Sequence, residues 1–135
     1  MSIVNFSFTK FNAERNSDKL EIFESSTDIK ISSITKEKYG SDEMLKFLFT
    51  FNVKYSNIGS VAVEGSVIAS DSNEKMDALL EKWKKSKAIS ELINDDIANK
   101  VVNTILYECN IKCLELAHSL RLPSHINMPL IKKSS

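Results

Sequence analysis

The chain is poor in glycine, proline and cysteine, and it carries no net charge of either sign. Its 135 residues include 3 glycines, 2 prolines and 2 cysteines, and 18 basic side chains balance 18 acidic ones. So few glycines, each isolated, cannot build the glycine-rich loops that hold phosphate groups. The balanced charge lacks the basic excess with which DNA- and RNA-binding domains neutralise phosphates. We therefore expect a protein with no cofactor and no nucleic-acid partner.

Long apolar runs, linkers and leader segments are also missing. No run approaches the roughly 20 apolar residues that span a bilayer. Residues 1–6 (MSIVNF) show neither the basic start nor the apolar core of a signal peptide. No Ser/Gly-rich linker or internal repeat divides the chain, so we expect one cytoplasmic domain, residues 1–135, with no membrane partner. In that compartment Cys109 and Cys113 are expected to be reduced thiols.

The apolar residues follow a period of two up to about residue 71 and a period near 3.6 beyond it. The clearest strand has an apolar side chain at every second position: Leu45, Phe47, Phe49, Phe51, Val53 and Tyr55. Turn-forming residues follow at 56–60, and a second arm at 61–69 makes this segment a hairpin. Gly65 interrupts the second arm, which indicates a bulge or a close contact above it.

The strands before this hairpin are less regular. Phe6 and Phe8 alternate, but Phe11 is out of phase with them. The polar residues 12–19 are predicted to form a loop, and two or three shorter strands are expected over residues 6–34 as a whole. The polar stretch 36–43 is predicted to connect these strands to the hairpin. Together these patterns predict an antiparallel sheet of about four strands.

Two helices are predicted in the second half of the chain. Residues 70–73 (SDSN) are good N-cap residues. The first helix then has apolar residues at helical spacing, namely Met76, Leu79, Leu80 and Trp83. Its lysine-rich run 81–87 fits a solvated helix face better than a nucleic-acid patch. The second helix starts at Asp95 and Asp96 and extends to about residue 120. The fold class is therefore α+β, an antiparallel sheet followed by two helices packed on one face.

The long helix is apolar over an unusually wide surface. A helix on the sheet of a monomer needs one apolar stripe, whereas this helix has two rows and a third side at Ile111 and Leu114. The surplus predicts burial against a second subunit in a dimer or tetramer. The residues predicted at this oligomer interface are Ile97, Val101, Val102, Ile105 and Leu106. The alternative is that the first helix covers the second stripe.

No residue pattern for catalysis is present. Cys109 and Cys113 lie four residues apart on one helical face, as two ligands of a zinc site could, but no clustered Cys or His completes such a site. Buried core thiols are the better interpretation. The two histidines, His118 and His125, are expected at the surface or an interface, and no nucleophile elbow accompanies them. We therefore expect neither a metal site nor an enzyme.

Beyond the long helix the sequence changes character at residues 120–123 (LRLP). Pro123 and Pro129 exclude a helix over residues 124–131. The apolar residues of this tail are Ile126, Met128, Leu130 and Ile131. Terminal segments fray unless something holds them, so we expect an extended tail docked on a surface.

This order of elements, with the ending LPSHINMPLI at residues 122–131, resembles the SecB family of export chaperones and a group of archaeal proteins of related build. The resemblance covers residues 6–131 at the level of pattern. It implies a four-stranded antiparallel sheet, two helices and a proline-containing extended tail, assembled as a dimer of dimers whose long helices pack together. Bacterial members are acidic and bind their export ATPase through an acidic tail, whereas this chain is neutral and ends in IKKSS.

The resemblance further implies that the protein holds non-native polypeptides, without ATP, in apolar grooves. Family grooves lie between the long helix, the sheet and the loop between the first two strands. By position, the polypeptide-binding candidates are Leu20, Ile22, Phe23, Leu48, Ile111, Leu114 and Leu120. Each of them is also a credible core or interface residue.

Other functions remain open beside the chaperone. One is an assembly or adaptor protein of the same fold, whose apolar surface serves its own oligomer or one fixed partner. Another is a carrier that encloses an apolar pocket for a small ligand. An enzyme is the last, because a fold never excludes a function. Exposed apolar grooves would favour the chaperone, and an enclosed pocket would favour the carrier.

Overall fold

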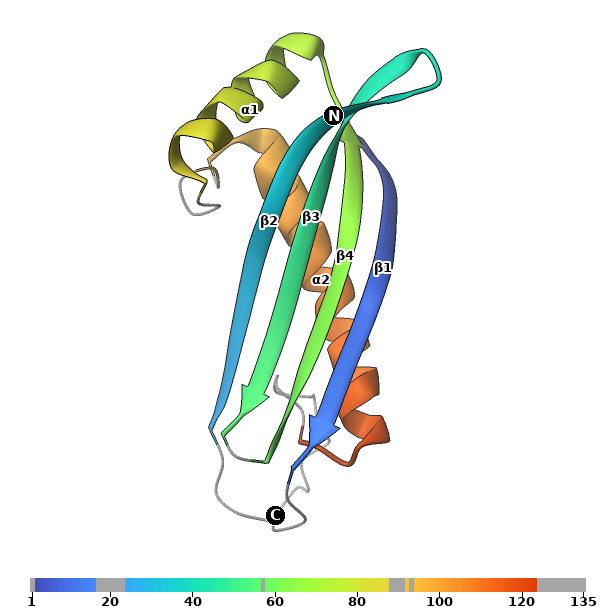
Figure 1. Ribbon diagram of the computed structural model, residues 1–135, viewed down its shortest axis with the longest axis vertical. Coiled ribbons are helices and arrows are strands. Elements are labelled where there is room, and N and C mark those ends of the chain that lie inside the picture. Colours follow the sequence, from blue (N-terminus) through green and yellow to red (C-terminus); the bar gives the residue numbers. More distant parts are fainter. Residues whose placement is uncertain (1, 17–23, 57, 88–91, 93, 124–135) are drawn as a thin grey trace, which may run out of the picture.

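The computed structural model describes residues 2–16, 24–56, 58–87, 92 and 94–123. The elements within these ranges are β1 (Ser2–Arg15), β2 (Ser25–Tyr39), β3 (Asp42–Tyr55), β4 (Gly59–Ser70), α1 (Asn73–Ser86) and α2 (Asp96–Ser119). The antiparallel strands lie in the order β1-β4-β3-β2, so β1 and β2 form the two edges of the sheet. The long helix α2 runs along one face of the sheet, and α1 lies near one end (Figure 1). The predicted α+β class is confirmed, while the predicted tail lies outside the described residues.

One face of the sheet forms a single core with both helices. The alternating residues of β3 predicted to be buried are 2% exposed or less: Leu45, Phe47, Phe49, Phe51, Val53 and Tyr55. Met76 and Leu79 from α1 join this core, and so do Ala98 and Val101 from α2. Because side chains alternate along a strand, the intervening residues of β3 point to the opposite, mostly polar face.

The first strand, β1, is longer than predicted. Asn12 pairs with Ala62 and Arg15 pairs with Gly59, so the loop predicted for residues 12–19 is wrong for residues 12–15. Residues 17–19 lie outside the described part of the chain. An edge strand exposes one side to solvent and therefore carries polar residues, which makes polarity there a poor indicator of a loop.

Two β-bulges explain the irregular phase of the apolar residues in β1. The register against β4 shifts at Val4 and again at Thr9. Each bulge adds one residue to β1 and reverses the parity of the side chains that follow it. As a result Phe6, Phe8 and Phe11 all lie on the core face of the sheet, although they do not alternate strictly in the sequence.

The second strand, β2, is also continuous, so β1 and β2 are two long strands where two or three shorter ones were predicted. A single bulge at Ser32 shifts its register against β3. This bulge keeps both Ile31 and Ile34 in the core, three positions apart. The strand continues to Tyr39, where Gly40 turns the chain into β3 with a positive φ of 67°. The connection predicted over residues 36–43 is therefore a tight turn between two long strands.

Gly65 is required where the ring of Phe49 packs on β4. A Cβ atom at position 65 would lie 2.7 Å from Phe49 Cζ and would also overlap the carbonyl oxygen of Ser7. The close contact predicted above Gly65 is confirmed. The Phe6 ring stacks on the Phe49 ring with centroids 5.3 Å apart, so the missing side chain makes room for aromatic packing that ties β1 to β3.

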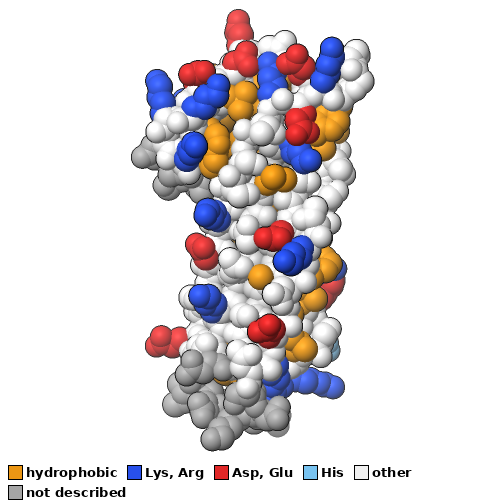
Figure 2. Space-filling view, in the orientation of Figure 1, with side chains coloured by type: hydrophobic (Ala, Val, Ile, Leu, Met, Phe, Trp, Pro, Cys, Tyr) orange, Lys and Arg blue, Asp and Glu red, His pale blue; other side chains and the backbone are white. Residues whose placement is uncertain are grey.

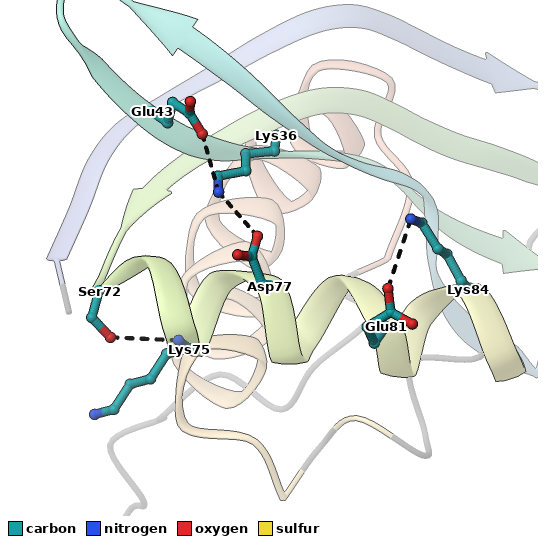
Figure 3. Close-up of polar contacts among 7 residues, drawn as sticks. All are labelled: Lys36, Glu43, Ser72, Lys75, Asp77, Glu81 and Lys84. Carbon is teal, nitrogen blue, oxygen red and sulfur yellow. Dashed lines mark hydrogen bonds and ion pairs between the residues drawn. The ribbon is translucent and has the colours of Figure 1, made fainter.

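Both helices begin where the sequence predicts, and a side chain caps each of them. The Ser72 hydroxyl accepts a hydrogen bond from the Lys75 N–H at the start of α1 (Figure 3). The Asp95 carboxylate accepts hydrogen bonds from the N–H groups of Ile97 and Ala98 at the start of α2. These oxygens satisfy N–H groups that have no partner within the first turn.

The long helix α2 ends in a Schellman motif. The Arg121 N–H donates to the His118 carbonyl oxygen at 3.1 Å, and the Leu122 N–H donates to the Ala117 carbonyl oxygen at 2.8 Å. Arg121 has a left-handed φ of 58°, a conformation that usually falls to glycine at this position. The buried Leu122 lies beside Gly59, so the chain has returned to the sheet before Pro123. The predicted end of the helix is confirmed.

An ion-pair cluster joins α1 to the β2–β3 hairpin. Lys36 Nζ lies 3.0 Å from carboxylate oxygens of both Glu43 and Asp77 (Figure 3). The hydrogen bond to Asp77, followed by that to Glu43, raises the pKa of Lys36 above its ordinary value. The cluster fixes α1 against the edge of the sheet while Trp83 enters the core, as predicted.

Candidate interaction surfaces

The face of α2 predicted to meet a second subunit is buried within this chain. Ile97, Val101 and Ile105 are 2% exposed or less, and Val102 is 6% exposed. Leu106 is half-buried against the same core. Fully buried side chains have no surface left for a partner, so the assignment of Ile97, Val101, Val102 and Ile105 to an oligomer interface is corrected. The row holds α2 on the sheet instead.

A second apolar strip lies on another side of α2. Tyr107, Ile111 and Leu114 follow at spacings of four and three residues and therefore share one helical face. Tyr107 is 68% exposed, Ile111 is 42% exposed and Leu114 is half-buried. We call these three residues the outer strip. Among the described residues, no strand and no other helix buries it, so the surplus apolar surface of the helix lies here.

A row of phenylalanines on β1 forms a third apolar feature, at the edge of the sheet. Phe6 and Phe8 meet edge to face with centroids 5.0 Å apart, and the Phe8 and Phe11 centroids are 5.2 Å apart. Lys112 of α2 reaches over this row, with its Nζ 5.4 Å from the Phe11 centroid and 5.9 Å from that of Phe8. Phe11 nevertheless remains 47% exposed. We call Phe6, Phe8 and Phe11 the β1 aromatic row.

The structure does not bring the predicted polypeptide-binding residues together in one groove. Leu48 is 38% exposed, but it alternates with Phe47 and Phe49 and so lies on the face of the sheet opposite α2. A groove that contains both Leu48 and Ile111 is therefore wrong. Leu120 packs against the core beside the end of α2. Leu20, Ile22 and Phe23 lie outside the described residues.

Sequence reasoning missed several residues of these surfaces. Tyr107 lies four residues before Ile111, and this helical spacing could have placed it on the same strip. Phe8 and Phe11 were separated by the irregular phase of β1, and only a bulge between them restores a common face. No sequence pattern indicates the contact of Lys112 with the β1 aromatic row, because this contact depends on how α2 crosses the sheet.

The thiols of Cys109 and Cys113 lie in the core, as predicted. Both side chains are fully buried. Burial raises the pKa of Cys109 to about 12 and that of Cys113 to about 11. Burial likewise raises the pKa of the neighbouring Tyr55 to about 12, with a contribution from Cys113. A thiolate is the reactive form of cysteine, so these groups are poor nucleophiles in the folded protein.

The remaining surfaces are polar. Basic and acidic side chains alternate over the face of the sheet opposite α2, with scattered apolar ones between them (Figure 2). An open hollow of about 510 Å³ lies between the β2–β3 turn and the start of α1; its lining is Ser41, Asp42, Glu43, Met44, Ser70, Asp71, Ser72 and Asn73. This polar lining does not suit the apolar ligand of a carrier.

One of the two histidines, His118, lies within the described ranges. His118 is exposed near the end of α2, as expected of a surface residue, whereas His125 lies outside those ranges. In the part of the chain that the structure covers, no group of three or more His, Cys, Asp or Glu residues is placed to hold a metal ion. No helix there is long and apolar enough to cross a membrane. Comparison with known proteins found no matching family model, no matching curated protein and no matching solved structure.

Proposed function

We propose that the protein is an oligomeric, ATP-independent holdase chaperone resembling SecB, which holds non-native polypeptides on exposed apolar surface. The observation that carries this proposal is the outer strip of α2, where Tyr107 and Ile111 are 68% and 42% exposed. The agreement of the sheet and helices with the build expected of that family supports the proposal as well. We further propose a cytoplasmic location, since the two cysteines form no disulfide and suit a reducing compartment.

The outer strip fits an extended, apolar client better than a folded ligand. It is a convex helix surface, so it forms no enclosed pocket. The charged neighbours Glu108, Lys112 and Glu115 keep one side of the strip in contact with solvent. Full burial of one large apolar side chain contributes about 1.5–3 kcal/mol. A few such contacts on each subunit give weak, unselective binding. Several strips in one oligomer then raise the overall affinity for a long client.

The second candidate is an assembly protein whose outer strip is covered by its own oligomer or by one fixed partner. The spacing of Tyr107, Ile111 and Leu114 favours it, because residues at four and three positions form the seam between packed helices. The two candidates share a surface but differ in what occupies it. An assembly protein has its outer strip filled at rest and binds no unfolded clients.

The deciding experiment measures light scattering of an unfolded, aggregating client while this protein is titrated in without nucleotide. We expect suppression that saturates near one client per oligomer. Ile111→Lys should weaken the suppression at least several-fold, because it places a charge in the centre of the strip. Asn99→Lys is the matched control, since it adds the same charge at an exposed α2 position twelve residues before Ile111 and on another side of the helix, and it should have no effect.

The mass of the protein in solution, measured by light scattering after gel filtration, separates the two candidates. If Ile111→Lys abolishes suppression and leaves an oligomer intact, the strip binds clients, as the holdase requires. If the unaltered, folded protein suppresses nothing and Ile111→Lys breaks its oligomer, the strip is an assembly seam and the holdase is excluded. A folded monomer without suppression contradicts both candidates.

A further inference from the structure

The carboxyl end of α1 concentrates basic side chains. Within six positions at this end, four lysines are exposed: Lys82, Lys84, Lys85 and the C-cap residue Lys87. Trp83 lies among them in the sequence but is buried in the core, so it holds this end of the helix on the sheet. The lysines are therefore presented from a fixed support. We call these four residues the lysine end of α1.

Neighbouring acidic groups offset only part of this charge. Lys84 Nζ lies 3.9 Å from a carboxylate oxygen of Glu81 (Figure 3), and Lys82 Nζ lies 3.8 Å from one of Asp95. Both lysine side chains remain more than half exposed, and exposed ion pairs of this kind are weak. Within the described ranges Lys85 and Lys87 form no ion pair. The helix dipole favours cations in its last turn, yet positive charge remains that an anionic partner can neutralise.

The arrangement of the lysines favours one class of anionic partner. Successive residues of a helix are about 100° apart, so the four lysines surround the end of α1 instead of lining one face. A flat membrane meets only one side of such an end, and residues 82–87 expose no apolar side chain that could insert into it. Single-stranded nucleic acids stack their bases on exposed aromatic rings, whereas Trp83 is buried. A flexible polypeptide can bend around the end and bring carboxylates to it from several directions.

We propose that the lysine end of α1 binds a flexible, acidic segment of a partner protein. The attraction between carboxylates and ammonium groups speeds the encounter more than it raises the affinity, and salt screens it. Because the ammonium groups recognise charge alone, the density of Asp and Glu in the segment matters more than their order. The proposal does not depend on the holdase function, which rests on the outer strip of α2.

The test is the fluorescence anisotropy of a labelled peptide in which Glu and Gly alternate, titrated with the full chain at low salt. We expect saturable binding that weakens at least tenfold when salt at about 0.15 M screens the charges. Lys82→Gln/Lys84→Gln/Lys85→Gln/Lys87→Gln should also weaken it at least tenfold. The matched control removes the same charge from exposed strand positions and should bind almost as well as the unaltered protein; it is Lys10→Gln/Lys30→Gln/Lys38→Gln/Lys54→Gln.

A charge-preserving variant separates recognition from the stability of the helix. Replacing the same four residues of α1 by arginine should retain the binding, and circular dichroism verifies that the helices of every variant remain folded. The proposal is overturned if the peptide does not bind, or if the control variant loses as much affinity as the α1 variant. It is equally overturned if phosphatidylglycerol vesicles or polyuridylate RNA bind the lysine end more tightly than the peptide does.

Discussion

The guanidinium of Arg15 donates a hydrogen bond to the carbonyl oxygen of Leu120 at 3.1 Å, across 105 residues of sequence. The same nitrogen donates to the carbonyl oxygen of Arg121. A cation at the carbonyl end of a helix also interacts favourably with the helix dipole. Arg15 thus fastens the end of α2 to the edge strand.

Removal of this side chain should therefore loosen the end of α2. We expect Arg15→Ala to lower the free energy of unfolding by about 1.5 kcal/mol, the lower end of the range for hydrogen bonds that involve a charged group, because one of its two bonds is exposed to solvent. Urea denaturation followed by far-ultraviolet circular dichroism measures the change. Glu14→Ala, at the exposed neighbouring position, is the control and should change little. Equal effects of the two substitutions would mean that the contact with α2 contributes nothing to stability.

Arg121 offers a substitution that should stabilise the protein. Its φ of 58° is strained for a residue with a Cβ atom, by about 1–2 kcal/mol. We expect Arg121→Gly to raise the free energy of unfolding by about 0.5–1 kcal/mol, since glycine relieves this strain but gives the unfolded chain more freedom. Thermal melts of the two proteins at equal concentration test this. A lower melting temperature for the glycine variant would show that the arginine side chain has a stabilising contact that outweighs the strain.

The packing of Phe49 on Gly65 predicts a destabilising substitution with a clear cause. Gly65→Ala would force the new methyl group into the Phe49 ring, and overpacking of this kind costs about 1–3 kcal/mol. The backbone of β1 is fixed on the other side, so neither neighbour can move away easily. Unfolding in denaturant measures this loss in the free energy of unfolding.

Gly40→Ala separates this effect from the general loss of a glycine. A Cβ atom at position 40 would have nothing within 4 Å, but the residue has a positive φ of 67°, so only backbone strain should matter there. Combining Gly65→Ala with Phe49→Leu should recover part of the lost stability, because the smaller side chain frees space. If the double variant loses as much stability as the two single variants together, the clash between the new methyl group and the Phe49 ring is not the cause of the loss.

The buried thiols predict a dependence of stability on alkaline pH. The folded-state pKa of Cys109 is raised from 9.0 to about 12. The Cys109 thiol therefore ionises at a lower pH in the unfolded chain than in the folded protein. Rising pH then stabilises the unfolded state relative to the folded state. Stability should be unaffected below pH 9 and should fall progressively between pH 9 and about 12. Unfolding curves at several pH values, compared with those of Cys109→Ala/Cys113→Ala, isolate this contribution.

The same thiols should react with a thiol reagent only after the chain unfolds. At pH 8 labelling should be slow in the native protein and rapid in denaturant, because the folded sheet and helix exclude the reagent and suppress the thiolate. Mass spectrometry of the labelled protein follows the reaction. Fast labelling of both cysteines without denaturant would contradict the burial of this side of α2.

The sequence predicted well those elements whose side chains alternate without interruption. Strand β3 follows strict alternation from Leu45 to Tyr55, and every residue predicted to be buried there is buried. Strand β1 was cut short because its last residues, 12–15, are polar on an exposed edge, and its bulges at Val4 and Thr9 break the alternation before them. A bulge is a property of the pairing between two strands, so neither strand reveals it alone.

The interface was misassigned for a related reason. The row with Val101 and Ile105 and the strip with Tyr107 and Ile111 are both apolar, and helical periodicity places them on different sides of α2. Periodicity does not say which side meets the sheet. The crossing of α2 over β4 decides this, and it buries the first row while leaving the outer strip uncovered.

The strand order has a consequence for the order in which the sheet assembles. Strands β2, β3 and β4 are consecutive neighbours, but β1 pairs with β4, so that Ser2 lies opposite Ser70. Contacts between distant parts of a chain form late, because a long loop must close before they stabilise anything. We expect β1 to be synthesised first and to join last. Until β4 has been synthesised, Phe6, Phe8 and Phe11 of the nascent chain have no sheet to pack in. The nascent chain is therefore itself an aggregation-prone, non-native polypeptide.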